Sequence, residues 1–136
     1  MKPSRGTHNG TVELARDTRF IRRVVLESPF AGDTARNTDY ARRAILDCIS
    51  RGESPIASHL LFPTFILDDD VRESRRLGID LGLAWHHACD AVVFYADLGF
   101  SPGMDGARTH CLAHGIHWEI RYIEPLTPIA PVRSVP

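Results

Sequence analysis

Short apolar runs alternate with segments of helical periodicity along the middle of the chain. Runs rich in β-branched or aromatic residues predict four strands, at residues 22–27, 55–58, 91–96 and 117–123. Apolar positions spaced three and four apart predict amphipathic helices over 34–50, 68–88 and 104–114. Gly52 and Gly115 follow the first and last of these helices, where a left-handed residue commonly ends a helix.

A strict alternation of strands and helices is typical of a parallel sheet with right-handed crossovers. We therefore predict an α/β protein with a three-layer, flavodoxin/Rossmann-like fold. It has a four- to five-stranded parallel sheet of order 2-1-3-4 and helices on both faces. The first and third strands flank the switch point of such a sheet, so the loops at 28–33 and 97–105 should face each other and form one site.

Two connecting segments have more than one interpretation. Residues 59–67 are apolar and predict a loop, which serves either as a lid on the sheet edge or as a wall of a base pocket. Three aspartates at 68–70 suit the start of the next helix, and consecutive carboxylates do not converge on one metal ion. Gly78 and Gly82 leave a bare stripe on that helix, which indicates close approach of a backbone, a partner subunit or a ligand.

The pattern weakens at both ends of the chain. Residues 1–20 are polar with little periodicity and predict a flexible arm with at most one marginal turn near 12–15. Four prolines from Pro125 onward predict an extended tail over 124–136. The interval 21–123 is predicted to fold as a single domain.

Composition narrows the functional classes. The formal net charge of −1 gives no basic surface, so we expect no binding to duplex nucleic acid. No apolar run approaches the roughly 18 residues of a membrane span, and the first nine residues lack a hydrophobic signal core. The three cysteines, Cys48, Cys89 and Cys111, form no paired framework. We expect a reduced, cytoplasmic protein that does not associate with membranes.

Several polar residues of the two loops are candidates for ligand binding. Ser28, Pro29 and Gly32 form either a simple turn or part of a site after the first strand. Asp33 either caps the following helix or contacts a ribose hydroxyl, and Asn37 lies one turn inside that helix, facing its mouth.

The histidines have structural and chemical interpretations. His59 is either buried under the apolar segment or exposed to a ligand. His110 and His114 are four apart and could flank a metal with His117, but no second ligand cluster completes a zinc set at familiar spacing. His86 and His87 are expected to point to different faces and to be incidental. We therefore predict no metal site and no cofactor.

Several short motifs across residues 22–123 show a family resemblance. They are Ser28-Pro29-Phe30, Gly32-Asp33, Arg36-Asn37, Tyr40-Ala41, Pro55-Ile56-Ala57, the run from His59 to Pro63, Leu67-Asp68-Asp69, Arg76, Gly78, Gly82, Cys89-Asp90 and Ser101-Pro102-Gly103-Met104. Together they resemble a family of small phage and bacterial domains grouped with the nucleoside 2-deoxyribosyltransferases.

The resemblance implies a nucleoside-type ligand and chemistry at an N-glycosidic bond. Enzymes of the wider group use a glutamate near the start of the helix after the third strand, where a carboxylate stabilises an oxocarbenium-like transition state. In the nucleotide hydrolases of the group, a serine and a glycine ahead of that glutamate hold the 5′-phosphate. These positions fall on Ser101 and Gly103, with Met104 beside them.

The glutamate position itself falls on Ala107, which cannot act as a nucleophile. We therefore expect Asp97 to be the general base or oxocarbenium stabiliser, with Asp105 as its substitute and His59 as the acid to the leaving base. Glu27 and Asp33 could approach from the opposite loop. Ser28, Pro29, Phe30, Gly32, Asp33 and Asn37, with Ser101, Gly103 and Met104, are the expected binding residues.

Two functions follow from this set of residues. One is a nucleoside or nucleoside 5′-monophosphate N-glycosidase or deoxyribosyltransferase; the other is a non-catalytic nucleotide sensor or sequestering protein, because of Ala107. The Gly78/Gly82 stripe and the apolar segment 59–67 also suggest a homo-oligomer, as in the resembled group, whose sites lie near subunit interfaces.

Overall fold

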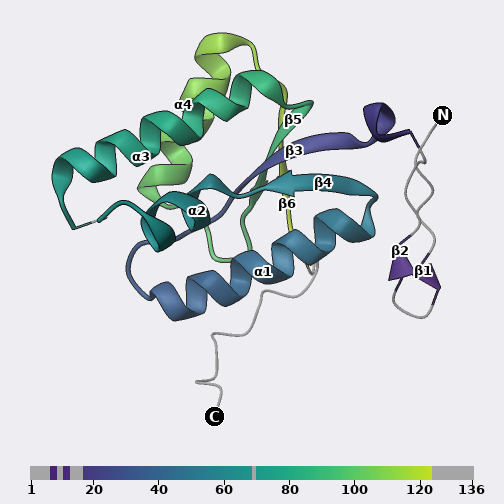
Figure 1. The fold of residues 1–136 in the computed structure, drawn as a ribbon, viewed down its shortest axis with the longest axis horizontal. Coiled ribbons are helices and arrows are strands. Elements are labelled where there is room, and N and C mark those ends of the chain that lie inside the picture. The colour runs from purple at the N-terminus through teal and green to yellow at the C-terminus, as the bar shows by residue number, and fades with distance from the viewer. Residues whose placement is uncertain (1–6, 9–10, 13–16, 69, 124–136) are drawn as a thin grey trace.

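A four-stranded parallel sheet forms the centre of the chain in the computed structural model, which describes residues 7–8, 11–12, 17–68 and 70–123. The strands are β3 (Arg22–Glu27), β4 (Glu53–Ile56), β5 (Ala91–Tyr95) and β6 (Trp118–Arg121). Their order in the sheet is β4-β3-β5-β6, and every neighbouring pair is parallel (Figure 1). This arrangement confirms the predicted order 2-1-3-4.

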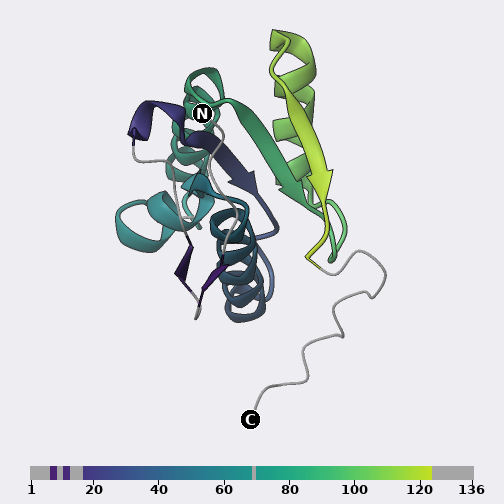
Figure 2. The same cartoon turned by 90° about the vertical axis from the view of Figure 1, so that its right-hand side faces the viewer.

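Helices cover both faces of the sheet, as Figure 2 shows in the view along its edge. Helix α1 (Thr34–Ser50) packs on one face, where Tyr40, Ala44 and Cys48 join the alternate strand residues Val24, Leu26, Val93 and Tyr95 in one core cluster. On the other face, Val25, Val92 and Phe94 pack against α4 (Pro102–His114). The two-residue period of the strands therefore produces two cores, and the three-layer α/β architecture is confirmed.

The segment predicted as an apolar loop is instead helix α2 (Ser58–Phe65), and this prediction was wrong. Helix α2 packs against α3 (Arg72–Trp85) and contacts β3. Its exposed residues Leu61 and Phe65 are apolar as well, so the sequence shows no helical alternation of apolar and polar positions. Helix α3 begins four residues later than predicted. Asp68 does not cap it; its side chain accepts a hydrogen bond from the backbone amide of Asp70 (2.9 Å) in the preceding turn.

The chain ends add little to the described fold. The predicted arm 1–20 includes a short antiparallel pair, β1 (Thr7–His8) with β2 (Thr11–Val12), and a 3₁₀ turn at Thr18–Phe20. Residues 13–15 of the predicted turn and the predicted tail 124–136 lie outside the described residues. Among the helices that are described, none has the length and apolar character needed to cross a bilayer.

A buried ionic cluster lies on the α1 side of the sheet. Its members, called here the Arg121 cluster, are Arg22, Asp47, Glu53, Tyr95, Glu119 and Arg121. The Arg121 guanidinium donates to both Glu53 oxygens (2.7 and 2.8 Å) and to Glu119 Oε1 (2.6 Å). Burial alone would raise the pKa of Glu119, but hydrogen bonds and charges from Arg121 and Arg22 lower it to about 2.

Candidate functional site

A pocket of about 250 Å³ opens at the carboxyl ends of β3 and β5. Its walls come from the end of β3 and the loop after it, from α2, from the inner side of α3 and from the first turns of α4. Ligands of open α/β sheets bind at this edge, beside the point where the strand order reverses. The two loops that were expected to face each other both contribute, through Ser28 and Ser101.

Ser28 and His59 form a hydroxyl–imidazole pair in the pocket. Ser28 lies directly after β3, and His59 lies in the first turn of α2, with Ser28 Oγ 2.8 Å from His59 Nε2. The ring of Phe30 meets the His59 ring edge-on, with centroids 6.4 Å apart. Burial lowers the pKa of His59, and the nearby Glu27 charge opposes this only in part. His59 is therefore a neutral imidazole near pH 7.

His59 also has a buried ring nitrogen with no hydrogen-bond partner. Nδ1 is inaccessible to solvent and contacts no donor or acceptor within the described part of the chain. An unpaired buried polar atom costs about 1–3 kcal/mol, and a bound group that reaches it recovers that free energy. A ligand recovers this cost only if the side chains around His59 move and expose Nδ1 to the pocket.

Glu27 is the one acidic residue that lines the pocket among the residues described. It is the last residue of β3, and its Oε2 lies 2.9 Å from Nε2 of His86, whose side chain is fully buried. His86 Nδ1 in turn lies 3.1 Å from His110 Nδ1 on α4. Because a carboxylate only accepts hydrogen bonds, His86 must donate through Nε2, which holds Glu27 in a fixed orientation.

The first turn of α4 forms the anion-friendly part of the wall. Ser101 caps this helix, and its hydroxyl accepts a hydrogen bond from the Met104 amide (3.2 Å) while its own proton can be donated. Pro102 occupies the first helical position, so the next backbone amide available at this end belongs to Gly103. The positive end of the helix dipole adds to the attraction for a phosphate.

The glycine stripe of α3 allows α2 to approach it closely. A Cβ built on Gly82 would lie 2.5 Å from Ser58 Oγ, and one on Gly78 would lie 3.4 Å from Leu67 Cδ1. The approach predicted from the two glycines is therefore the packing of another segment of the same chain. It also places Ser58 and His59 against the pocket.

The structure brings together six of the predicted site residues. Lining the pocket are Ser28, Phe30, His59, Ser101, Gly103 and Met104. Four predicted binding residues do not line it. Pro29 lies between two that do, while Gly32 (φ +95°) lines an adjoining shallow hollow.

The other two of these four, Asp33 and Asn37, support the loop after β3 instead of lining the pocket. Asp33 caps α1 by accepting a hydrogen bond from the Arg36 amide (3.1 Å). Asn37 Nδ2 donates to the carbonyls of Phe30 and Ala31 (3.1 and 3.0 Å), which fixes the loop between them. Asp33 therefore has the capping role that the sequence left open, and Asn37, which was expected to bind a ligand, holds the loop after β3.

Two predicted catalytic carboxylates lie outside the pocket. Asp97 Oδ1 accepts hydrogen bonds from the Tyr40 hydroxyl (2.5 Å) and from the Ile123 amide (3.0 Å), on the α1 side of the sheet. Asp105 is exposed on α4 and pairs with Arg108 (2.9 Å). The expectation that the end of the third strand supplies the pocket carboxylate is corrected, because the chain turns Asp97 toward α1 as it leaves the sheet.

Sequence reasoning gave no site role to Ser58, Ser74 and Arg75, which line the pocket, and only a secondary one to Glu27. The two-residue alternation of side chains along β3 could have predicted the position of Glu27. Val25 and Glu27 share a face, and Val25 packs toward α4, so the side chain of Glu27 points to the α4 side at the carboxyl end of the strand. His86 was expected to be incidental, and its buried contact with Glu27 shows that this was wrong.

Residues 22–122 match a protein family described as Domain of unknown function (DUF7768). The chain belongs to this family. The match begins at the first residue of β3 and ends one residue after β6, so the DUF7768 domain contains the whole sheet, the covering helices and the pocket. No curated protein and no solved structure matches the chain.

Proposed function

We propose that the pocket binds a nucleoside or nucleoside 5′-monophosphate and that Glu27 promotes cleavage of its N-glycosidic bond. The observation that carries this proposal is the fixed carboxylate of Glu27 inside the pocket. It lies in the same pocket as Ala107, where the resembled deoxyribosyltransferases have their catalytic glutamate. A carboxylate from β3 thus takes over the task of one from α4.

The pocket residues divide by chemistry into three parts. The hydroxyl of Ser101, the amide of Gly103 and the guanidinium of Arg75 suit a 5′-phosphate. Phe30, Pro63 and Ile79 offer an apolar surface for a base. Glu27 and the Ser28–His59 pair remain for the sugar and the bond to the base.

In a hydrolytic reaction, the bond between C1′ and the base nitrogen breaks, and its electron pair leaves with the base. Water supplies the hydroxyl to C1′ and the proton to the base. The negative charge of Glu27 stabilises the oxocarbenium character of the transition state. His59 is neutral near pH 7, so it positions the Ser28 hydroxyl through Nε2 and does not act as the stored proton that we first expected.

The direct test is release of free base from deoxynucleosides, ribonucleosides and their 5′-monophosphates, followed by chromatography. We expect release by the native chain and its loss, by at least about 100-fold, in Glu27→Gln. Asp90→Asn is the matched control, because Asp90 is an exposed acid that accepts from the Arg23 amide at the other end of the sheet. Loss of activity in Asp97→Asn with retention in Glu27→Gln would return the catalytic role to Asp97 and refute this assignment.

Ala107 favours a second function, in which the pocket binds a nucleotide without cleaving it. Micromolar binding of a nucleotide, measured by calorimetry, with no base released over hours would replace the enzymatic proposal by this one. Absence of binding to every nucleoside and nucleotide would reject both.

The proposal includes self-association, which was predicted from the sequence. The glycine stripe does not support self-association, because α2 of the same chain packs on it. Exposed apolar residues on and next to α2 and α3 do support it, and these are Leu61, Phe65, Ile66, Leu77, Ile79 and Trp85. Light scattering at high protein concentration checks it, and a monomer there would remove this part.

A further inference from the structure

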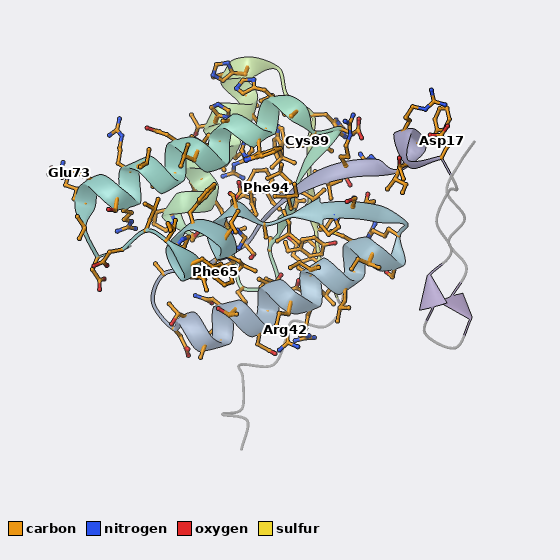
Figure 3. The ribbon with its side chains drawn as sticks, in the orientation of Figure 1. Asp17, Arg42, Phe65, Glu73, Cys89 and Phe94 are labelled. Carbon is orange, nitrogen blue, oxygen red and sulfur yellow. The ribbon has the colours of Figure 1, made fainter. Side chains whose placement is uncertain are left out.

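Four histidine rings lie close together between the turn that follows α3 and the helix α4. His86 and His87 lie in the 3₁₀ turn His86–Ala88, and His110 and His114 lie on α4. Figure 3 labels Cys89, the residue that directly follows this turn. Ring centroids are 4.5 Å apart for His110 and His114, and 5.0 Å apart for His87 and His114.

Three of these rings can point a ligand atom at one place. Nitrogen atoms of His87, His110 and His114 all lie within 4.8 Å of one another. His110 and His114 are four apart on a helix and so share one face, a spacing that protein zinc sites use. His87 supplies the third nitrogen from the adjacent turn, which the linear sequence does not reveal.

The buried neighbour His86 prepares His110 for this role. Glu27 accepts the proton of His86 Nε2, so Nδ1 of a neutral His86 carries a lone pair. It then accepts the Nδ1 proton of His110 across 3.1 Å. That leaves Nε2 of His110 unprotonated and able to bind a metal ion, while the hydrogen bond from its other ring nitrogen orients the ring, as such bonds do for metal-binding histidines.

We propose that His87, His110 and His114 bind one Zn²⁺ ion, with water as the fourth ligand. The three nitrogens around a tetrahedral zinc lie about 3.4 Å apart, so rotations that move each ring by about 1 Å complete the site. His87 and His114 are exposed and free to make this adjustment. Imidazole ligands favour zinc and similar transition metals over Mg²⁺ and Ca²⁺, which prefer oxygen.

The site is distinct from the pocket and does not rest on the function proposed above. It is nevertheless connected to the pocket through His110, His86 and Glu27. Metal bound to Nε2 of His110 keeps the proton of that ring on Nδ1, which is the hydrogen-bond direction that the Glu27 carboxylate already imposes on His86.

The experiment is titration of the full chain with Zn²⁺ in competition with a chelating dye, and with Co²⁺ monitored by its visible absorption spectrum. We expect one tightly bound zinc per chain, a tetrahedral cobalt spectrum and a thermal unfolding midpoint that rises with zinc concentration. Mg²⁺ should not compete.

Variants assign the ligands. His87→Ala and His114→Ala should each weaken zinc binding by more than about 100-fold, and both positions are exposed, so the chain should remain folded. His117→Ala is the matched control, because this histidine lies outside the cluster beside Glu119 and should leave the affinity unchanged. Equal affinity in native chain and His114→Ala, or loss of binding in His117→Ala alone, would overturn the proposal.

Discussion

Two buried polar groups of residues flank the same sheet, and they are organised in opposite ways. In the Arg121 cluster on the α1 side, Arg121 binds two carboxylates and the hydroxyl of Tyr95, and Asp47 accepts the Tyr95 proton. On the α4 side, Glu27 has one histidine partner, and His59 keeps a buried nitrogen with none in the described residues.

This difference separates a structural role from a functional one. When all partners of a buried polar group lie within the protein, removing one partner leaves the other unpaired and lowers the stability of the fold. A group left partly unpaired carries a cost that a ligand can remove. The pocket also holds the Glu27 carboxylate, whose one hydrogen-bond partner among the described residues is His86, and titratable groups in a pocket contribute to binding and chemistry more often than to folding.

The largest expected effect is on the Arg121 cluster. Arg121→Met leaves the Glu53 carboxylate buried without its main partner, which should cost about 3–5 kcal/mol of unfolding free energy. Urea denaturation measures it. Arg23→Met, which removes an exposed arginine 3.6 Å from Asp90, should change stability by less than about 0.5 kcal/mol. Equal losses in the two variants would contradict the structural role of the cluster.

The next effect tests the packing that forms the pocket wall. Gly82→Ala places a methyl group 2.5 Å from Ser58 Oγ and 3.3 Å from Ser58 Cβ, so the Ser58 hydroxyl must rotate and α2, which carries His59, must move by a few tenths of an ångström. We expect a loss of about 1–3 kcal/mol and weaker nucleotide binding.

A matched helical glycine provides the control for that substitution. Gly106→Ala on α4 meets nothing within 4 Å and should stabilise the chain by about 0.5–1 kcal/mol through helix propensity alone. Thermal unfolding of both variants shows whether the two glycines differ as the packing requires. A stabilised Gly82→Ala would contradict the close approach of α2.

The sheet order was predictable because it depends on patterns that are local in the sequence. The alternation of Val24, Val25 and Leu26 assigns residues to two cores, and the strand–helix alternation permits few topologies. Five of the six predicted pocket residues follow β3 or β5, and they were predictable because the carboxyl ends of these neighbouring parallel strands lie at one edge of the sheet.

The remaining features depend on contacts between segments that no local pattern records. The direction in which Asp97 leaves the sheet is decided by its bonds to Tyr40 and Ile123, from two distant elements. Likewise, His87 joins His110 and His114 only because α3 ends beside α4. Helix α2 was missed because its exposed side also carries apolar residues, Leu61 and Phe65, so the segment lacks the polar face that marks an amphipathic helix.

A smaller effect separates helix capping from phosphate binding. Ser101→Ala and Asp33→Ala each remove an N-cap hydrogen bond, of α4 and α1, and should each cost about 1 kcal/mol of stability. Only Ser101→Ala removes a hydroxyl from the pocket, so it alone should weaken a 5′-monophosphate, by about tenfold, relative to the nucleoside. Calorimetric titration of both ligands checks this. An equal loss of 5′-monophosphate affinity in Asp33→Ala would mean that the effect comes from reduced helix stability and not from a lost phosphate contact.

The smallest effect is in the pH dependence, where the two sides of the sheet respond in different windows. Burial lowers the pKa of His59, so below its ordinary value of about 6.5 the unfolded chain binds a proton that the folded chain does not, and stability falls as the pH decreases.

Glu119, with a pKa of about 2, contributes stability that is present above about pH 4.5 and is lost between there and pH 2. Urea denaturation from pH 7.5 to 3 should therefore show a shallower upper slope in His59→Gln and a shallower lower slope in Glu119→Gln. Other histidines contribute equally to the native chain and to both variants, so they cancel in the comparison. Parallel curves for native chain and His59→Gln above pH 5 would mean that burial does not hold His59 in its neutral form, and the predicted difference in pH dependence between the two sides of the sheet would be wrong.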